Sequence, residues 1–331
     1  MRLNLFAVLL GAILILPLPA LGQSIGSSTG GSSFTISVRP QYPTPYGQAT
    51  ISLLSDSLDL ANAIATISVA GKEIYKGSVQ PVAVTLGKPG SATSVKVTVS
   101  SGGTSYSQTI FIQPQDVILI AEPVSSAPPL YPGKPLVPIG GSVRVVAMAN
   151  LKDASGKTLD PATLSYSWTV DATQIANSSG IGKTAIMVAS PLQYRARSVS
   201  VAVTSQNGSL VGGASLSLTS QEPSVRIYRN DPLLGIRFDH ALSGQFSISD
   251  AEETLYAAPF SLPTTSGEPI LQWFLNNSAA QTGSTITLRP TGNGQGNASL
   301  SLSASSGNST PATANLSLSF GAKQSFNPFG L

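Results

Sequence analysis

The sequence has 331 residues, with 18 basic and 15 acidic side chains, a formal net charge of +3 at pH 7, one histidine and no cysteine. So small an excess of positive charge gives no electrostatic basis for binding nucleic acid. Without cysteine the chain can form neither disulfide bonds nor thiolate metal sites, so each domain has to be stabilised by its own hydrophobic core.

The first 22 residues have the pattern of a secretory signal peptide. Arg2 is followed by an apolar run from Leu3 to Leu16 and then by the segment Ala20-Leu21-Gly22, which has small residues at the cleavage positions. The run is shorter than the ~20 apolar residues that a membrane-spanning helix needs. We therefore expect cleavage after this segment, an exported protein in the periplasm, at the cell surface or outside the cell, and no transmembrane span in the mature chain.

Residues 23–33 are rich in Gly and Ser and are predicted to be a flexible leader. Beyond them the chain contains a hairpin pattern three times, in which two alternating strands flank a turn rich in Gly or Asn. Alternation with period two is typical of strands that bury one face in a sandwich. The three hairpins are Val95, Val97 and Val99 through Gly102-Gly103 to Ile110 and Ile112; Val199, Val201 and Val203 through Asn207-Gly208 and Gly212-Gly213 to Leu216 and Leu218; and Leu300 and Leu302 through Gly307-Asn308 to Leu316, Leu318 and Phe320.

A strand with a bulky central residue precedes each hairpin, and these residues are Ile67, Trp168 and Trp273. They lie 101 (67 to 168) and 105 (168 to 273) positions apart, which is the length of one immunoglobulin-like domain. We expect both tryptophans to be buried in their own domains, and we prefer this to a sugar-stacking platform because of their central position.

Two further strands complete each repeat. This pattern predicts an all-β protein of three tandem immunoglobulin-like β-sandwich domains, at residues 34–114, 115–221 and 222–320, with prolines near the junctions. The opening strands are predicted at Phe34–Val38, Val117–Ala121 and Val225–Tyr228, and the following ones at Ala49–Leu53, Val143–Met148 and Thr254–Ala258.

The segments Trp168-Thr169-Val170-Asp171 and Trp273-Phe274-Leu275-Asn276 resemble bacterial immunoglobulin-like and PKD-like domains of surface proteins. The stretches from Pro129 to Pro135 and from Ile227 to Gly235 are similar to segments that recur in uncharacterised exported multi-domain bacterial proteins. The resemblance implies a fold and a location and does not imply an activity.

Two glycine-rich segments have some features of nucleotide-binding motifs. The segment from Ser179 to Thr184 ends as a P-loop does, but Asn177 stands where the first glycine belongs, and the strand context predicts a hairpin turn. The segment from Gly292 to Gly296 is predicted to be a loop tip, because no helix follows it. We therefore expect no cofactor.

His240, beside Asp239 and Arg237, is the one candidate for acid–base chemistry, and we interpret it as a loop residue because no nucleophile is positioned near it in the sequence. Calcium could be considered at Asp250 with Glu252 and Glu253, or at Asp56 with Asp59. Neither group has the spacing of a calcium-binding loop, so we expect solvated turns, no metal site and no catalytic residue.

The last eleven residues, 321–331, form an apolar tail. Its apolar side chains are candidates for docking a membrane or envelope partner. The alternative is that the tail folds back over the open end of the third domain, because burying one Phe is worth roughly 1.5–3 kcal/mol. The candidate docking residues are Phe326, Pro328, Phe329 and Leu331.

These patterns together favour a non-catalytic exported module with a structural, adhesion or assembly role in a bacterial envelope or surface, with envelope or surface proteins as partners. A module that binds a glycan or a peptide through loops at a sandwich end is the alternative, and an extracytoplasmic hydrolase is a distant third.

We predict that the mature protein begins at Gln23, because the cleavage positions precede it. The intact mass of the exported protein checks this. Retention of residues 1–22 in most molecules would contradict it.

Overall fold

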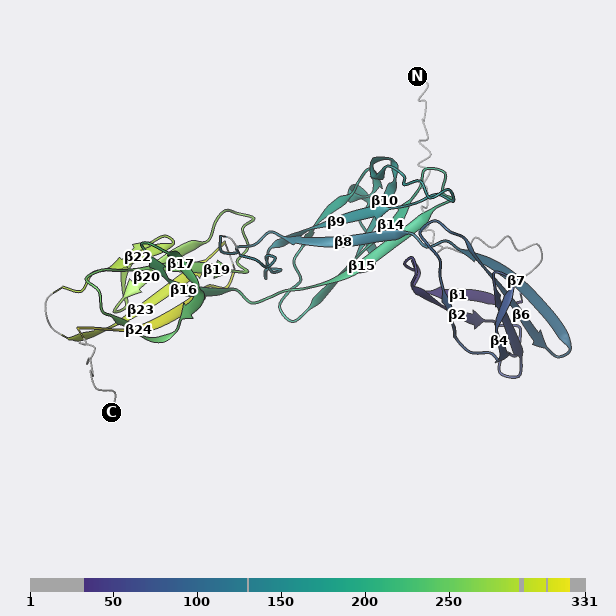
Figure 1. Ribbon diagram of the computed structural model, residues 1–331, viewed down its shortest axis with the longest axis horizontal. Coiled ribbons are helices and arrows are strands. Elements are labelled where there is room, and N and C mark those ends of the chain that lie inside the picture. The colour runs from purple at the N-terminus through teal and green to yellow at the C-terminus, as the bar shows by residue number, and fades with distance from the viewer. Residues whose placement is uncertain (1–32, 130, 292–294, 308, 322–331) are drawn as a thin grey trace, which may run out of the picture. The chain divides into compact units, whose positions relative to one another are not determined.

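The computed structural model describes residues 33–129, 131–291, 295–307 and 309–321 (Figure 1). The regular structure in these ranges is β-strand, apart from two 3₁₀ turns, at Pro161–Thr163 and Ala176–Ser178. No helix in these ranges has the length and apolar character needed to cross a membrane. The chain divides into two compact units, one with residues 33–87 and 92–113 and the other with residues 88–91 and the described residues from 114 onward. Each unit is described by itself.

The first unit is one β-sandwich. Its two sheets have the strand orders β1-β2-β5 and β4-β3-β6-β7, and the side chains that face each other between the sheets form its core. The strands are β1 (Thr35–Arg39), β2 (Gln48–Leu54), β3 (Ile64–Val69), β4 (Lys72–Ser78), β5 (Val82–Thr85), β6 (Thr93–Ser101) and β7 (Thr104–Ile112).

The second unit begins with a sandwich of the same kind. Its sheets have the orders β13-β9-β8 and β11-β10-β14-β15, and β12 also pairs with β10. The strands are β8 (Asp116–Pro123), β9 (Ser142–Asn150), β10 (Ser165–Val170), β11 (Thr173–Gln174), β12 (Gly180–Ile181), β13 (Ala185–Ala189), β14 (Ala196–Thr204) and β15 (Val211–Thr219).

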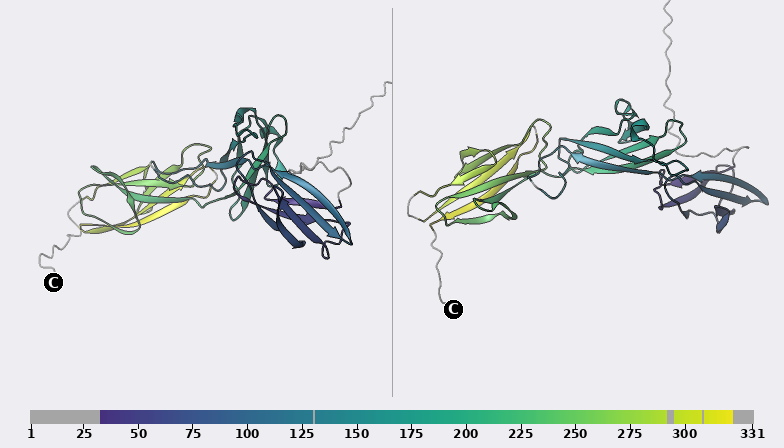
Figure 2. Two further views of the ribbon diagram at one scale, coloured as in Figure 1. Left: turned by 45° about the vertical axis from the view of Figure 1, so that its right-hand side comes forward. Right: turned by 45° about the horizontal axis from the view of Figure 1, so that its top comes forward.

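A third sandwich completes the second unit, and Figure 2 shows its strands, coloured green to yellow, from two further sides. Its sheets have the orders β17-β16-β19-β22 and β18-β24-β23-β20-β21, in which β18 runs parallel to β24. The strands are β16 (Ser224–Asp231), β17 (Gly235–Leu242), β18 (Gly244–Ile248), β19 (Glu253–Phe260), β20 (Ile270–Leu275), β21 (Ser278–Thr282), β22 (Thr285–Leu288), β23 (Gly296–Ser305) and β24 (Ala312–Phe320).

Apart from the additional strands β12, β17 and β18, the strand order is the same in all three sandwiches. The first, second and fifth strands form one sheet, and the third, fourth, sixth and seventh form the other. Antiparallel sheets connected in this way define an immunoglobulin-like sandwich. The prediction of an all-β chain with three tandem immunoglobulin-like domains is therefore confirmed, whereas the domain boundaries at 114/115 and 221/222 stay a prediction.

The bulky residue predicted for the third strand of each sandwich lies at the same place in the core. Ile67, Trp168 and Trp273 are 1%, 0% and 0% exposed. Their partners on the neighbouring strand are Val97, Val201 and Leu302. The two indole Nε1–H groups donate to the carbonyl oxygens of Lys183 (2.8 Å) and Gly283 (2.9 Å). The tryptophans therefore pack in cores, and the alternative of a sugar-stacking platform is wrong.

The same strand ends in the same two-residue turn in each sandwich. The turns are Ala70-Gly71, Asp171-Ala172 and Asn276-Asn277, and all six residues have positive φ, as a two-residue hairpin turn that matches the strand twist requires. The Asp171 and Asn276 side-chain oxygens also accept hydrogen bonds, each 2.9 Å long, from the backbone N–H groups of Ser198 and Ser299. The carboxylate and the amide thus connect the turn to the adjacent strand.

One predicted turn differs in the structure. Gly212-Gly213 belongs to β15 rather than to the turn, which is confined to the residues around Gly208. A Cβ atom on Gly212 would lie 2.8 Å from Cβ of Gln115 and 2.9 Å from Cγ2 of Val117. Glycine is therefore needed here because β8 approaches the backbone closely.

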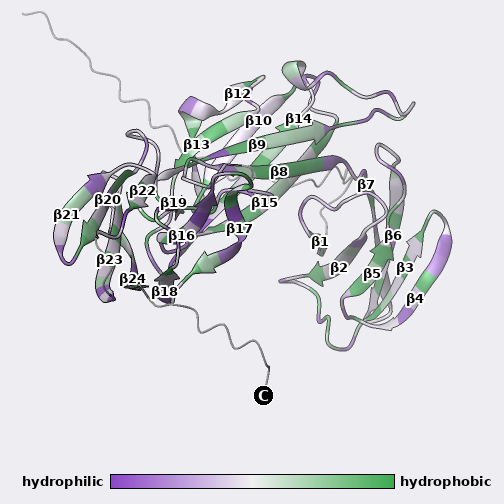
Figure 3. Cartoon of the chain, turned by 60° about the vertical axis from the view of Figure 1, so that its left-hand side comes forward, coloured by the Kyte–Doolittle hydropathy of each residue, from purple (hydrophilic) through white to green (hydrophobic). Residues whose placement is uncertain are grey.

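Hydropathy follows the predicted alternation along the strands. Figure 3 shows green residues interrupted by white and purple ones on individual strands, and β4 is largely purple. In β6, Val95, Val97 and Val99 are buried, whereas the residues between them are exposed or partly exposed. Each sheet thus turns an apolar face inward.

We predict that Trp168→Ala or Trp273→Ala lowers the free energy of unfolding of the affected domain by about 3–5 kcal/mol, because each leaves a large cavity and one carbonyl oxygen without its indole donor. Denaturant unfolding of the full chain measures this. Phe111→Ala is the matched control, because Phe111 is 58% exposed and its loss is expected to change stability by less than ~0.5 kcal/mol. Equal effects of the control and the tryptophan variants would contradict the prediction.

Candidate functional site

The long loop between β8 and β9, residues 124–141, is hydrogen-bonded to the segment that follows β19 in the third sandwich. Ser126 N–H donates to Leu262 O (2.8 Å), and Ser126 Oγ accepts from Leu262 N–H (3.1 Å). The carbonyl oxygens of Ser126 and Val124 accept from Ser261 and Thr264, at 3.1 Å each. Backbone groups of the loop are thus satisfied as they would be in a sheet.

The other part of the loop contacts the connection between the second and third sandwiches. Gln221 N–H donates to Val137 O (2.8 Å), and Pro138 forms an isolated bridge with Gln221. Ser125 Oγ donates to Leu136 O (2.6 Å), which brings the two ends of the loop together. The described residues of the loop are therefore held near both of its ends.

The sheet beneath this loop carries aromatic side chains on its outer face. Side chains alternate along β16 and β19, so Val225, Ile227 and Leu255 enter the core, and the residues between them point the other way. This outer face would normally be polar in a sandwich. It carries Arg226, Tyr228 and Ser224 from β16 and Tyr256 and Phe260 from β19, which are paired across the two strands or lie beside each other.

Aromatic rings on this face meet edge to face. The ring centroids of Tyr228 and Phe238 are 5.2 Å apart, and those of Phe238 and Tyr256 are 6.0 Å apart. The loop adds Tyr131, whose ring lies 5.6 Å from that of Phe260 at an interplanar angle of 79°. Such pairs are favoured by the ring quadrupoles and give the rings fixed orientations.

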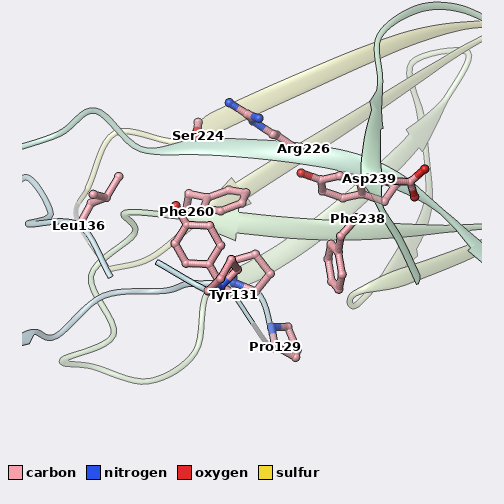
Figure 4. Close-up of a pocket in the computed structure, with 11 residues that line it drawn as sticks. Pro129, Tyr131, Leu136, Ser224, Arg226, Phe238, Asp239 and Phe260 are labelled. Carbon is pink, nitrogen blue, oxygen red and sulfur yellow. The ribbon is translucent and has the colours of Figure 1, made fainter. Parts of the chain in front are cut away.

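A cavity of about 600 Å³ lies between the loop and this face. Figure 4 shows the side chains that line it, with Tyr131 and Phe260 close together, Phe238 apart from them and Pro129 below. Most of its wall is apolar, as is usual for sites that bind small ligands or peptide side chains. The lining residues are Pro128, Pro129, Tyr131, Pro132, Leu136, Ser224, Arg226, Tyr228, Phe238, Asp239 and Phe260.

Two charged side chains line the cavity, and they differ in their partners. Asp239 receives two hydrogen bonds from Arg237, at 3.0 and 3.1 Å, which hold the pKa of its carboxyl below the usual value. The Arg226 guanidinium carbon lies 5.7 Å from the centroid of the Phe260 ring. No carboxylate among the described residues forms an ion pair with Arg226. Of the two, Arg226 is therefore the charged side chain that can form an ion pair with a ligand.

A second arginine on β16 has carboxylate partners. Arg229 donates to Glu253 (2.7 Å), which is only 5% exposed, and to Asp250 (3.1 Å). Burial raises the pKa of the Glu253 carboxyl, and the hydrogen bond from Arg229 partly offsets this effect. The expectation of solvated turns is therefore wrong for Glu253, which is buried as an ion pair at the start of β19.

Two further calcium candidates, Glu252 and Asp59, also have protein partners. Glu252 binds Arg289 (2.7 Å), and the Asp59 carboxylate accepts from Ala61 N–H and the Asn62 amide. Within the ranges that the structure describes, no group of three acidic or histidine side chains is placed to hold a metal ion.

His240 is exposed and lies on β17, the edge strand that pairs with β16. Its interpretation as a loop residue is therefore wrong. The segment from Ser179 to Thr184 contains β12 and the connection to β13. The prediction of a hairpin turn here is wrong, because β12 pairs with β10 and β13 pairs with β9 in the other sheet. A strand, β13, follows the segment in place of the helix of a P-loop. The glycines at 292 and 294 and the tail residues Phe326, Pro328, Phe329 and Leu331 lie outside the described residues.

The structure brings together the two stretches that the resemblance singled out separately. Pro129, Tyr131 and Pro132 of the first stretch and Tyr228 of the second line the same cavity. The sequence analysis predicted no site here. Strict alternation along β16 and β19 could have indicated one, because it assigns aromatic residues to outward-facing positions, where polar residues are expected.

No protein-family model and no curated protein sequence matches this chain. Among solved structures, it is similar to three N-terminal domains of the bacteriophage RB49 outer capsid protein Hoc, at 14% identity and a TM-score of 0.22, over 86% of this chain and 98% of that one. It is also similar to the central fibronectin-III array of RIM-binding protein, at 9% identity and a TM-score of 0.26, over 84% and 95% of the two chains.

A third similar structure is that of fibronectin(III)-like modules of Clostridium thermocellum CbhA, at 8% identity and a TM-score of 0.24, over 61% of this chain and 93% of that one. By the order and pairing of its strands, the protein belongs to the class of tandem immunoglobulin-like sandwich proteins.

We predict that Arg229→Met destabilises the protein by roughly 1–3 kcal/mol at pH 7 and by much less near pH 4, because it leaves the buried Glu253 carboxylate unpaired. The folded-state pKa of Glu253 then lies above its unfolded value of about 4.3. Stability of the variant is thus retained below that value and lost as the pH rises through the folded pKa.

Denaturant unfolding at pH 4 and pH 7 measures this difference. Arg289→Met is the matched control, because its partner Glu252 is half exposed and exposed pairs contribute only ~0–1 kcal/mol. A loss in the Arg229 variant that is the same at both pH values would show that the Glu253 charge is not responsible.

Proposed function

We propose that the protein is a non-catalytic, exported module with a structural, adhesion or assembly role in a bacterial cell envelope or surface structure. The observation that carries this proposal is the attachment of the 124–141 loop to residues 261–264 and Gln221. A loop that belongs to one sandwich and is hydrogen-bonded to the next supports a protein that works by holding its domains and partners together.

Export is supported by the signal-peptide pattern of residues 1–22, and the bacterial surface by the resemblance of the Trp168 and Trp273 segments. We infer that the partners are envelope or surface proteins. The tail residues Phe326, Pro328, Phe329 and Leu331 are the proposed anchors for such a partner. Packing of the tail on the third sandwich is the alternative use of these side chains.

A second candidate function is the binding of a peptide or a glycan. It is favoured by the cavity of about 600 Å³, which is formed by a loop at a sandwich end and an aromatic sheet face. The two functions are compatible, because a surface module can hold a partner through one site and serve as a spacer through its other domains.

The proposed function is tested in the native cell by comparing the full chain with a chain lacking residues 321–331. We expect the full chain in the exported fraction, co-purifying with envelope components after cross-linking. Loss of this association with unchanged thermal stability of the purified variant supports docking by the tail, and loss of stability supports packing on the third sandwich.

Full-length protein confined to the cytosol would contradict the proposed function. If the deletion alters neither association nor stability, both roles of the tail are wrong, while association of the full chain would still support the envelope role.

A further inference from the structure

We propose that the cavity beneath the 124–141 loop binds an extended peptide segment of a partner protein that contains proline and, beside it, an acidic residue. This inference rests on the second function proposed above, the binding of a peptide or glycan, and does not depend on the structural role.

The outer face of β16, β17 and β19 has more aromatic surface than the loop covers. Tyr228 is buried, but Phe238 remains 38% exposed and Tyr131 41% exposed at the cavity. Large apolar side chains that stay exposed around one cavity lose unfavourable contact with water when a ligand covers them. The cavity thus has a driving force for binding an apolar group.

The loop places proline residues in the wall of this cavity. Pro128 is buried, and Pro129 and Pro132 line the cavity opposite the aromatic rings. Proline lies flat on aromatic side chains and has little conformational entropy to lose, which is why proline-containing segments commonly bind aromatic-lined grooves. A partner segment that contains proline would bring to the aromatic rings the same chemistry that the loop already places in the wall of this cavity.

Arg226 adds a requirement for negative charge. Of the arginines on β16 and β17, Arg229 is paired with Glu253 and Asp250, and Arg237 is paired with Asp239. Arg226 lies over Phe260 at the cavity and has no ion-pair partner among the described residues. A guanidinium group binds a carboxylate through paired hydrogen bonds, so an aspartate or glutamate in the ligand would complete this site.

The polar groups of the cavity favour a peptide over a glycan. Besides Arg226, the charged or hydroxyl groups of the lining are Asp239, which Arg237 already occupies, Ser224 and the two tyrosine hydroxyls. A sugar ring presents several hydroxyl groups, and each loses its water on binding unless it finds a partner. A proline side chain requires no such partner.

The experiment is selection of random twelve-residue peptides, displayed on phage, on the full-length protein, with counter-selection on the Phe238→Ala, Arg226→Met double variant. We expect the recovered peptides to share a proline and an acidic residue at a constant spacing. The best peptide should bind the wild type at least tenfold more tightly than it binds Phe238→Ala, and Arg226→Met should remove the preference for the peptide over its Asp/Glu→Lys counterpart.

Phe111→Ala and Arg195→Met, which alter an exposed aromatic and an exposed arginine elsewhere, are the matched controls and should leave the dissociation constant unchanged. Thermal unfolding of each variant shows whether the sandwich is intact. Recovery of the same peptides on the wild type and the double variant, or of peptides without proline and acid, overturns the proposal.

The same titrations are made with an oligogalacturonate as an acidic glycan. If it binds in a Phe238-dependent manner and the peptides do not, the assignment to peptide is wrong, although the second proposed function stands. If neither probe binds and the variants are folded, the binding function fails as well, and only the structural role remains.

Discussion

The packing of one bulky side chain at the centre of each sandwich is the constraint on which the rest of the structure depends. Ile67, Trp168 and Trp273 occupy the same position of the third strand, and with no cysteine in the chain no disulfide bond can connect the two sheets in their place. Their burial fixes the register with the sixth strand, because a shift by one residue would turn every side chain to the other face. The turn that follows and the hairpin of the last two strands are positioned by that register.

The third sandwich combines this common core with a second apolar layer. Its first sheet buries Val225 and Ile227 on one side and exposes aromatic rings on the other, so the outer face needs a cover of its own. The 124–141 loop provides part of that cover and supplies Tyr131 and its prolines. The same apolar surface therefore explains both the attachment of the loop and the cavity beside it. A polar outer face would provide neither.

The sandwiches could be predicted from the sequence because their strands alternate strictly and repeat at about one hundred residues. Trp168 and Trp273 stand out in that pattern, and the structure buries both. The cavity could not be predicted in the same way, since its walls come from segments that are separated by about a hundred residues and meet only through the loop. Glu253 was misjudged for a related reason: a carboxylate is expected in solvent, and its burial depends on Arg229 on a neighbouring strand.

The attachment of the loop can form only late in the synthesis of the chain. The hydrogen bond between Ser126 and Leu262 joins residues that are 136 positions apart in the chain. At ~5–20 residues per second, the ribosome makes the second of them roughly 7–27 s after the first, a delay that is long compared with the folding of a small domain. The second sandwich therefore has time to fold while the 124–141 loop still lacks the segment that follows β19, to which it is hydrogen-bonded. During that interval its prolines hinder pairing with another chain, because they have no N–H to donate.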